Sequence, residues 1–326
     1  RSYGNAPKAG LYNSAKMTAH VVSEKLDIPT ILEVVADGNS VDRELHKWKP
    51  EWCVIEALWV TPQKLNELRK LHPHVTFIIR IHSEIAFLSN EGIAIEWIGQ
   101  YSKMKNVFVA FNSSSTLEAF ISSSSSSNTG AYIYLPNLYN ERYSNYINLL
   151  HSRSKRVNIG CFGAIRPLKN QLIQAFAAIA WGNKYNKQIC FHINSGRVEQ
   201  GGESTLKNIR ALFKNSPHTL IEHPWMDRNK FLMLVSSMDV GMQLSFTESF
   251  NIVAADFVSQ HVPIVVSSTI SWMNEYLQCS VDDVNNIVNA LQKVYNNYFY
   301  SQLVQTLSLR SYNKGAIKEW RKNFKN

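Results

Sequence analysis

Short apolar runs alternate with amphipathic stretches along the first half of the chain. The runs are rich in β-branched and aromatic residues, which is typical of strands buried on both faces of a sheet. They lie at Pro29–Asp37, Trp52–Val60, Val75–Ser83, Val107–Asn112 and Ala131–Pro136. The stretches between them predict helices at Asn13–Leu26, Pro62–Leu71 and Ile93–Met104. Strands and helices in alternation predict a parallel, doubly wound α/β sheet.

The same alternation begins again near residue 157. Strands are predicted at Val157–Phe162, Gln188–Asn194, Thr219–His223, Val240–Leu244 and Pro263–Ser267. Helices are predicted at Gln171–Trp181, Ser204–Lys214, Arg228–Ser236 and Phe250–Gln260, and the tail after Val281 is mainly helical in pattern. The second half therefore predicts a second α/β domain of similar size.

The polar stretch Asn140–Arg156 marks the boundary between the two halves, whereas the serine run Ser122–Ser127 predicts a surface loop. We expect Rossmann-like domains over residues 1–150 and 151–305, followed by a helix over 306–326 that packs back on the N-terminal domain. Two doubly wound domains that face each other form a cleft at the carboxyl ends of their strands, where ligands bind.

Composition places the chain among ordinary globular proteins. Its 326 residues are 45% hydrophobic and 18% charged, with no apolar run long enough to span a membrane and no signal-peptide pattern. The four cysteines are scattered, form no C-x-x-C pair and indicate reduced structural thiols, and no His stands at zinc-ligand spacing. These features predict a cytoplasmic protein, in the host cytoplasm if the source is viral, without a metal site.

The positive charge of the chain is concentrated in its second half. Residues 1–150 hold 14 basic and 14 acidic side chains, whereas residues 151–326 hold 20 and 11 and therefore carry the whole net charge of +9. A partner that carries phosphates would favour this arrangement. The alternative is a solvated basic surface that serves solubility.

The strongest chemical signal lies between Ser236 and Ser268. A predicted strand ends at Leu244, and the polar loop after it carries Glu248. Asp256 follows eight positions later, two turns into the predicted helix, so both carboxylates can face one ligand. The alternative is an ordinary amphipathic helix with a stray Glu before it.

Backbone groups at the start of this helix add a second type of ligand contact. The first N–H groups of a helix have no intrahelical partner, and the helix dipole favours an anion there. We therefore expect a diphosphate beside the N–H groups of Phe250, Asn251 and Ile252.

A second loop carries two basic side chains. It follows the predicted strand Val157–Phe162 and holds Gly163, Arg166 and Lys169. A guanidinium and an ammonium at this place would neutralise the negative charge of a bound diphosphate. The alternative is two basic residues on a surface turn.

Together the two loops resemble the retaining glycosyltransferases of family 4, which have the GT-B fold. The family signature is a Glu, seven residues and a second Glu, followed by a V-P-[IV]-V strand. Here the two acids are Glu248 and Asp256, and the strand is Val262–Val265. The family's Gly-Phe-Gly after the first Glu is Ser249–Asn251 here, and its usual Arg in the other loop is Ala164.

The resemblance implies roles for these residues. Glu248 would lie near the donor sugar, and Asp256, one methylene shorter than the family's Glu, would bind the nucleotide ribose. Arg166, which replaces the missing guanidinium, and Lys169 would hold the diphosphate. The remaining residues implied to line the nucleotide site are Gly163, Ser249, Phe250, Asn251 and Ile252.

The N-terminal half resembles the family more loosely. Gly10 lies in a PKAGLYN segment similar to the family's Gly-containing loop near the acceptor. His82 ends a predicted strand where the family often has a His beside the donor sugar. The alternative for His82 is a purely structural role.

The reaction implied is the transfer of a sugar from a nucleotide sugar, most often a UDP-sugar, to a hydroxyl with retention at the anomeric carbon. No metal, further cofactor or side-chain nucleophile is implied.

Three hypotheses remain for the partner of this site. A hydroxymethylated base in DNA fits the basic second half and a loose similarity of the segment from Ile79 to Trp97 to phage glycosyltransferases. A cell-envelope glycan or a lipid-linked acceptor fits the same charge through peripheral membrane contact. The third is a non-catalytic nucleic-acid-binding module on a GT-B scaffold.

Overall fold

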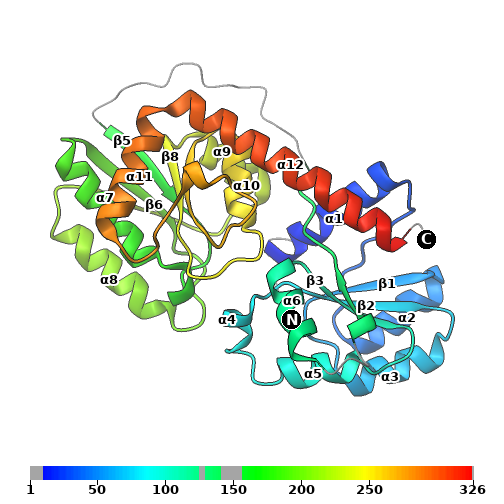
Figure 1. Cartoon of the computed structure of the whole chain (residues 1–326). Helices are drawn as coiled ribbons and strands as arrows, with labels where there is room; N and C mark the ends of the chain where they lie inside the picture. Colours follow the sequence, from blue (N-terminus) through cyan, green and yellow to red (C-terminus); the bar gives the residue numbers. More distant parts are fainter. Residues whose placement is uncertain (1–9, 125–128, 141–155, 325–326) are drawn as a thin grey trace. The chain divides into compact units, whose positions relative to one another are not determined.

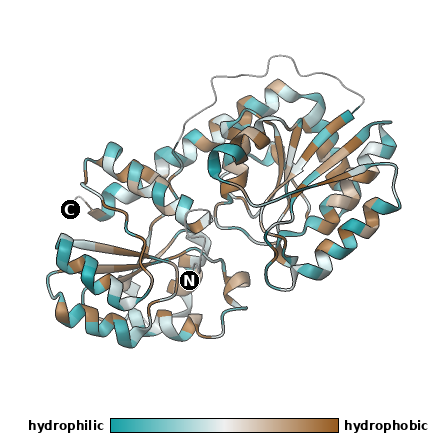
Figure 2. Cartoon of the chain, turned by 180° about the vertical axis from the view of Figure 1, so that it is seen from behind, coloured by the Kyte–Doolittle hydropathy of each residue, from teal (hydrophilic) through white to brown (hydrophobic). Residues whose placement is uncertain are grey.

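The computed structural model describes residues 10–124, 129–140 and 156–324, and the chain divides into two compact units (Figure 1). Unit 1 comprises Arg1–Asn140 and Lys314–Asn326, and unit 2 comprises Glu141–Asn313. The hydrophobic residues of each unit gather on its strands and on the inward faces of its helices (Figure 2).

Unit 1 contains a parallel four-stranded sheet in the order β1-β2-β3-β4. Its strands are β1 (Trp52–Glu56), β2 (Thr76–Ile81), β3 (Val107–Phe111) and β4 (Tyr132–Tyr134). Its helices are α1 (Gly10–Leu26), α2 (Gly38–Trp48), α3 (Pro62–Leu71), α4 (Ile85–Leu88), α5 (Ala94–Tyr101) and α6 (Ser114–Ser123).

The two faces of this sheet pack against different helices. Successive strands are neighbours, so right-handed crossovers place their connecting helices on one face. Phe77 and Ile79 of β2 point to that face and join a buried cluster with Leu65 and Leu68 of α3. The next residue, Arg80, points to the opposite face, under Trp320.

The predicted strand at Pro29–Asp37 is wrong. The chain is irregular there, and Ile31 and Val34 are 55% and 56% exposed. Strand propensity alone cannot form a strand without a neighbour to pair with. The helix that follows, α2, was not predicted, although Asp37 caps it by accepting a hydrogen bond from the Ser40 N–H at 2.7 Å.

Unit 2 contains a parallel six-stranded sheet in the order β10-β9-β8-β5-β6-β7. Its strands are β5 (Arg156–Cys161), β6 (Gln188–Asn194), β7 (Thr219–His223), β8 (Val240–Gln243), β9 (Ile264–Ser267) and β10 (Gln278–Cys279). Its helices are α7 (Gln171–Lys184), α8 (Gly202–Lys214), α9 (Arg228–Ser236), α10 (Ile252–Ser259), α11 (Val284–Asn296) and the first part of α12 (Tyr298–Phe324).

The strand order in unit 2 changes direction beside β5. From β5 the chain moves outward to β6 and β7, then returns to the other side of β5 as β8. Such a topological switch point opens a crevice at the carboxyl ends of the two central strands, which is where open α/β sheets bind ligands. The loops after β5 and β8 flank this point.

The last helix, α12, contributes residues to both units. In unit 2, Gln305 of α12 donates to the carbonyl of Val262 at 2.9 Å. In unit 1, Trp320 donates its indole N–H to the carbonyl of Pro136 at 2.8 Å and lies 5.4 Å from the Arg80 guanidinium. Among the helices within the described ranges, none is both long and apolar enough to cross a bilayer.

Candidate active site

The loop after β5 holds its two basic side chains through a specific backbone path. Gly163 adopts a φ of +119°, which side-chain-bearing residues rarely reach, and its N–H donates to the Asn194 side chain at 3.1 Å. Pro167 then opens a short 3-10 turn, and Asn170 ends it in the left-handed region at φ 57°. The turn carries Lys169, with Arg166 just before it.

The loop after β8 ends in a capped helix start. Asn251 also adopts a positive φ, 59°, and its side-chain oxygen accepts a hydrogen bond from the Ala254 N–H at 2.9 Å. Asn is among the few non-glycine residues that tolerate this conformation and is a good N-cap. This explains how Asn251 can stand where the resembling family has Gly.

Four buried amide side chains fix the two loops to each other. Asn170 donates to the carbonyls of Leu244, at 3.0 Å, and of Val281, at 2.7 Å. Gln174 accepts from the Leu244 N–H at 3.1 Å and donates to the Lys169 carbonyl at 2.8 Å. Because a buried amide is costly unless its donors and acceptors are paired, this network sets one loop geometry.

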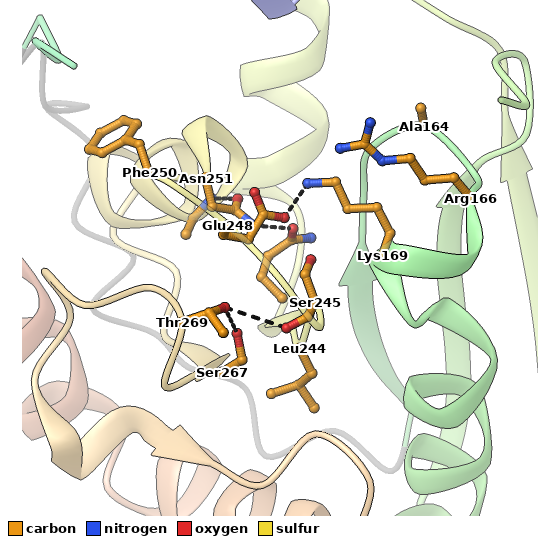
Figure 3. A network of polar contacts seen from close by, with 12 residues as sticks. Ala164, Arg166, Lys169, Leu244, Ser245, Glu248, Phe250, Asn251, Ser267 and Thr269 are labelled. Carbon is orange, nitrogen blue, oxygen red and sulfur yellow. Dashed lines mark hydrogen bonds and ion pairs between the residues drawn. The ribbon is translucent and has the colours of Figure 1, made fainter. Parts of the chain in front are cut away.

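The other two amides continue the network to α10. Gln243, at the end of β8, donates to the Phe162 carbonyl and accepts from the Asn251 side chain, both at 2.9 Å. The loop after β8 also meets the one after β9, since the Thr269 hydroxyl lies 2.7 Å from the Ser267 hydroxyl and 3.5 Å from the Ser245 carbonyl (Figure 3).

Lys169 and Glu248 form an ion pair between these loops (Figure 3). Their side chains are 14% and 9% exposed, so the pair is largely shielded from water. Arg166 extends from the same loop toward the same side, with its guanidinium 3.9 Å from the Glu199 carboxylate. The structure thus brings together three of the four charged residues that the sequence predicted for the site in this half, and the fourth, Asp256, pairs with Arg228.

The start of α10 differs from the prediction. The helix begins at Ile252 with Asn251 as its N-cap, so Phe250 is not part of the first turn. Phe250 is buried instead, with its ring stacked on Trp272 at 5.5 Å and on Tyr312 at 5.1 Å. A large apolar side chain gains more from this packing than from exposure at a helix end. The Phe250 N–H is therefore not a helix-end donor.

Asp256 is deeply buried in an ion pair. Its carboxylate is 1% exposed, and its oxygens lie 2.5 and 3.1 Å from the two terminal nitrogens of Arg228. Arg228 begins α9, and Asp256 lies on α10. The predicted ribose contact of Asp256 stays a prediction, and Arg228 is a neighbour that sequence spacing did not suggest.

In unit 1, His82 belongs to a charged cluster at the carboxyl ends of β1 and β2. Its Nε2 is hydrogen-bonded to Glu56, which also accepts from Arg80 at 3.1 and 3.2 Å. Arg80 has no exposed surface and donates further to the Leu135 carbonyl at 3.0 Å and to the Asn137 side chain at 2.6 Å.

Burial and neighbouring charges shift the pKa values of Glu56 and His82 in this cluster. Burial opposes ionisation of Glu56, but the positive charge of Arg80 and the contact with His82 hold its pKa at about 2. Burial lowers the pKa of His82 despite the attraction of Glu56. A carboxylate therefore orients a neutral imidazole, an arrangement suited to hydrogen bonding with a hydroxyl.

Sequence reasoning missed Arg80 and Glu56, although one signal was present. Arg80 is a charged residue inside the apolar run that became β2, and Glu56 stands opposite it in the parallel register. A buried charge in a strand requires a partner. Gly10 begins α1, the segment before it lies outside the described residues, and its predicted acceptor contact stays a prediction.

Two further features lie away from these loops. A surface groove of about 490 Å³ runs between α7 and α8, and none of the predicted site residues lines it. In unit 1, the potential metal ligands of Asp42, His46 and His72 lie within 4.8 Å of one another. The sequence predicted no such cluster, because its members are separated along the chain.

Two parallel α/β units, one of them with a topological switch point in its sheet, define the class: the chain has the fold of the GT-B glycosyltransferases. The predicted fold class is therefore confirmed. No family model matches the sequence, and no curated protein matches it.

Several solved structures of trehalose-6-phosphate synthases are similar to this chain. The apo structure of OtsA has a TM-score of 0.65 at 15% identity, covering 88% of this chain and 75% of its own. An Escherichia coli structure bound with UDP-2-fluoro glucose has a TM-score of 0.64 at 14% identity, with the same coverage. A UDP-forming synthase from Burkholderia xenovorans in complex with glucose-6-phosphate has a TM-score of 0.63 at 16% identity, covering 88% and 76%. They support the GT-B class, and neither membership of family 4 nor a DNA-modifying role.

Proposed function

We propose that this chain is a retaining glycosyltransferase whose donor, a UDP-sugar, binds to unit 2. The observation that carries the proposal is the shielded Lys169–Glu248 pair, with Arg166 beside it, at the switch point of a GT-B fold. One structural neighbour is bound with UDP-2-fluoro glucose, and another neighbour, also a trehalose-6-phosphate synthase, transfers its glycosyl group with retention. These neighbours support a uridine nucleotide as the donor.

Lys169 and Arg166 would bind the diphosphate of the donor. An ammonium has three N–H donors, so Lys169 can keep its contact with Glu248 while it donates to a phosphate oxygen. Arg166 adds a planar guanidinium, which suits bidentate phosphate contacts. As the bond to the sugar breaks, negative charge grows on the leaving diphosphate, and these fixed positive charges stabilise it most in the transition state.

Glu248 would have two roles in this scheme. Its carboxylate holds Lys169 in place, and its second oxygen can accept hydrogen bonds from sugar hydroxyls. Gly163, Ser249, Asn251 and Ile252 would place backbone groups around the nucleotide, with the first turn of α10 directed at negative charge. Phe250 would contribute by packing beneath this loop.

The nucleotide ribose would contact the Arg228–Asp256 pair. Asp256 is buried and ion-paired with Arg228, so we propose that its role is to orient the Arg228 guanidinium. Arg228 has more exposed surface than Asp256 and would make the contact with the ribose. This changes the role that the resemblance to family 4 implied for the second acid.

Retention needs no side-chain nucleophile in this proposal. The leaving phosphate accepts the proton of the attacking hydroxyl on the same face of the sugar. Burial raises the pKa values of Cys53, Cys161 and Cys279 to about 12, so these thiols stay protonated and are poor nucleophiles. In unit 1, the neutral His82 held by Glu56 would hydrogen-bond a hydroxyl of the bound sugars.

For the acceptor we retain a hydroxymethylated base in DNA as the finer proposal. Its support is the excess of basic residues in the second half of the chain. One structural neighbour is in complex with glucose-6-phosphate, and a phosphate-bearing acceptor would suit the basic second half of this chain. A lipid-linked glycan carries phosphate as well.

One experiment tests the donor chemistry. The protein is mixed with UDP-sugars and an acceptor panel of glucose-6-phosphate, DNA containing 5-hydroxymethylcytosine and a lipid-linked sugar, and released UDP and product mass are measured. We expect Lys169→Met and Glu248→Gln to lower kcat/KM by about 10²–10³-fold. Lys230→Met is the matched control, because Lys230 is 76% exposed.

The outcomes separate the parts of the proposal. UDP release with a mass gain in one acceptor supports the reaction and identifies the acceptor. Release of UDP without a DNA adduct would contradict the DNA acceptor and would still support the use of a UDP-sugar donor. Wild-type rates in both site variants, or no turnover of any nucleotide sugar, would overturn the assignment of the site and favour a binding role.

A further inference from the structure

Three potential metal ligands meet where α2 passes the end of α3. Asp42 and His46 lie four residues apart on α2 and therefore share one face of the helix. His72 follows the last residue of α3 and is buried, with its Nε2 2.7 Å from the Asp42 carboxylate. The rings of His46 and His72 meet edge to face at 5.5 Å.

We propose that Asp42, His46 and His72 bind a divalent transition-metal ion, with Zn²⁺ as the best fit. One ligand atom from each residue can be chosen so that all three lie within 4.8 Å of one another. Zinc binds imidazole nitrogen and carboxylate oxygen at about 2.0–2.2 Å, so ligand atoms around a tetrahedral ion are roughly 3.4 Å apart. The contact between His72 and Asp42 would open slightly, and the exposed His46 would turn inward.

The donor set favours this choice of ion. Two imidazoles and one carboxylate suit zinc and its neighbours in the transition series, whereas Ca²⁺ and Mg²⁺ prefer oxygen ligands alone. Three protein ligands leave a fourth position for water.

The backbone under the ligands is already fixed without a metal. Val41 and Leu45 bury the inner face of α2 in the cluster that also contains Leu65 and Leu68 of α3. Asp37 caps the start of α2, and Lys49 ends it in the left-handed region with its N–H bonded to the Leu45 carbonyl. Only the side chains need to move, so binding costs little ordering of the chain.

A metal here would tie α2 to the end of α3 in unit 1. All three ligands lie outside the donor loops of unit 2, so this proposal is independent of the proposed reaction. Its expected consequence is stabilisation of unit 1 when metal is present, because an ion that binds only the folded state raises the unfolding temperature.

The test measures zinc binding directly. Chelator-treated full-length protein is titrated with Zn²⁺ against a chromophoric chelator, and thermal unfolding is followed with and without zinc. We expect one tight site per chain and a Tm higher by roughly 5–10 °C at about 100 times Kd. His46→Ala should bind zinc at least about tenfold more weakly.

His74→Ala is the matched control. His74 is an exposed histidine two residues after His72, and its ring lies 6.3 Å from the His72 ring, outside the ligand set. It should bind zinc like the wild type. Asp42→Asn, which keeps an acceptor for His72 and removes the charge, should also weaken binding. Equal affinity in wild type and His46→Ala, or no tight site in the wild type, would overturn the proposal.

Discussion

The two sheets of this protein differ in how they position the candidate site residues. In unit 2 the strand order reverses between β5 and β8, which is the kind of position where open α/β sheets bind ligands. In unit 1 the described strands follow one another from β1 to β4 without a reversal. The polar groups of unit 1 instead depend on charged residues placed in the strands, above all Arg80. Topology places the candidate site residues of unit 2, and side-chain chemistry places those of unit 1.

The networks that support the two sites differ in the same way. Unit 2 fixes its loops with neutral amides, and the side chains of the Lys169–Glu248 ion pair between them are 14% and 9% exposed. Unit 1 uses its charges internally, since Glu56 and Arg80 neutralise each other. Changes to unit 1 should therefore act mainly on stability, and changes to unit 2 mainly on loop position and donor binding.

The largest effect is expected for Arg80→Met. This change leaves Glu56 as a buried carboxylate without its main counter-charge, and removing one partner of a buried pair costs about 3–5 kcal/mol. Hydrogen exchange of β2 and β3 peptides by mass spectrometry would measure it. The control is Arg43→Met, because the Arg43 side chain is 70% exposed. Protection of β2 at the wild-type level would show that the charged cluster does not hold unit 1 together.

A smaller effect is expected for Gln243→Leu in unit 2. The Asn251 side chain and the Phe162 carbonyl would each lose a hydrogen bond, which costs about 1–3 kcal/mol when the group stays buried. Denaturant unfolding would give the loss, and the KM for the UDP-sugar should rise because Asn251 no longer holds the loop. Gln188→Leu, whose amide is exposed at the start of β6, is the control. An unchanged KM would show that the amide network does not influence donor binding.

A third effect, which grows as the pH falls, is expected in unit 2. Burial, with the nearby His223 and Arg156, lowers the pKa of His192 to about 4. The unfolded chain therefore binds a proton first, and this part of the stability is lost as pH falls from about 6.5 toward 4. The slope is at most about 1.4 kcal/mol per pH unit for one histidine.

His192→Gln should reduce the change in stability per pH unit for β6. The stability of β2, in unit 1, should keep its wild-type dependence on pH. Unfolding curves from pH 7 to pH 4 would measure it, with His20→Gln as a control on α1. An unchanged slope in the variant would assign the acid sensitivity to other groups, such as His223, whose pKa burial also lowers.

Sequence patterns predicted the strands and helices best where local signals agreed. The bounds of α3, β6, β7 and α9 match the predicted ranges, and Thr61 caps α3, with Pro62 in its first turn. Pro29–Asp37 failed because a run of β-branched residues cannot reveal whether a neighbouring strand is present.

The charged part of the site could be predicted because it follows strand ends, as Glu248, Lys169 and His82 do. The contacts that hold these residues could not, since they join distant positions: Asn170 reaches Val281, and Asp256 reaches Arg228. The same is true of Asp42 and His72, thirty positions apart in the chain. Such pairs become visible only after folding brings their helices together.

The division of the chain has a consequence for its synthesis on the ribosome. Unit 1 is interrupted: the chain leaves it at Asn140 and returns at Lys314. Trp320, which covers Arg80 and bonds to Pro136, is made 184 residues after that proline. All residues of unit 2 are therefore synthesised before the segment from Lys314 that completes unit 1. The domain whose synthesis starts first is the one whose folding can be completed last.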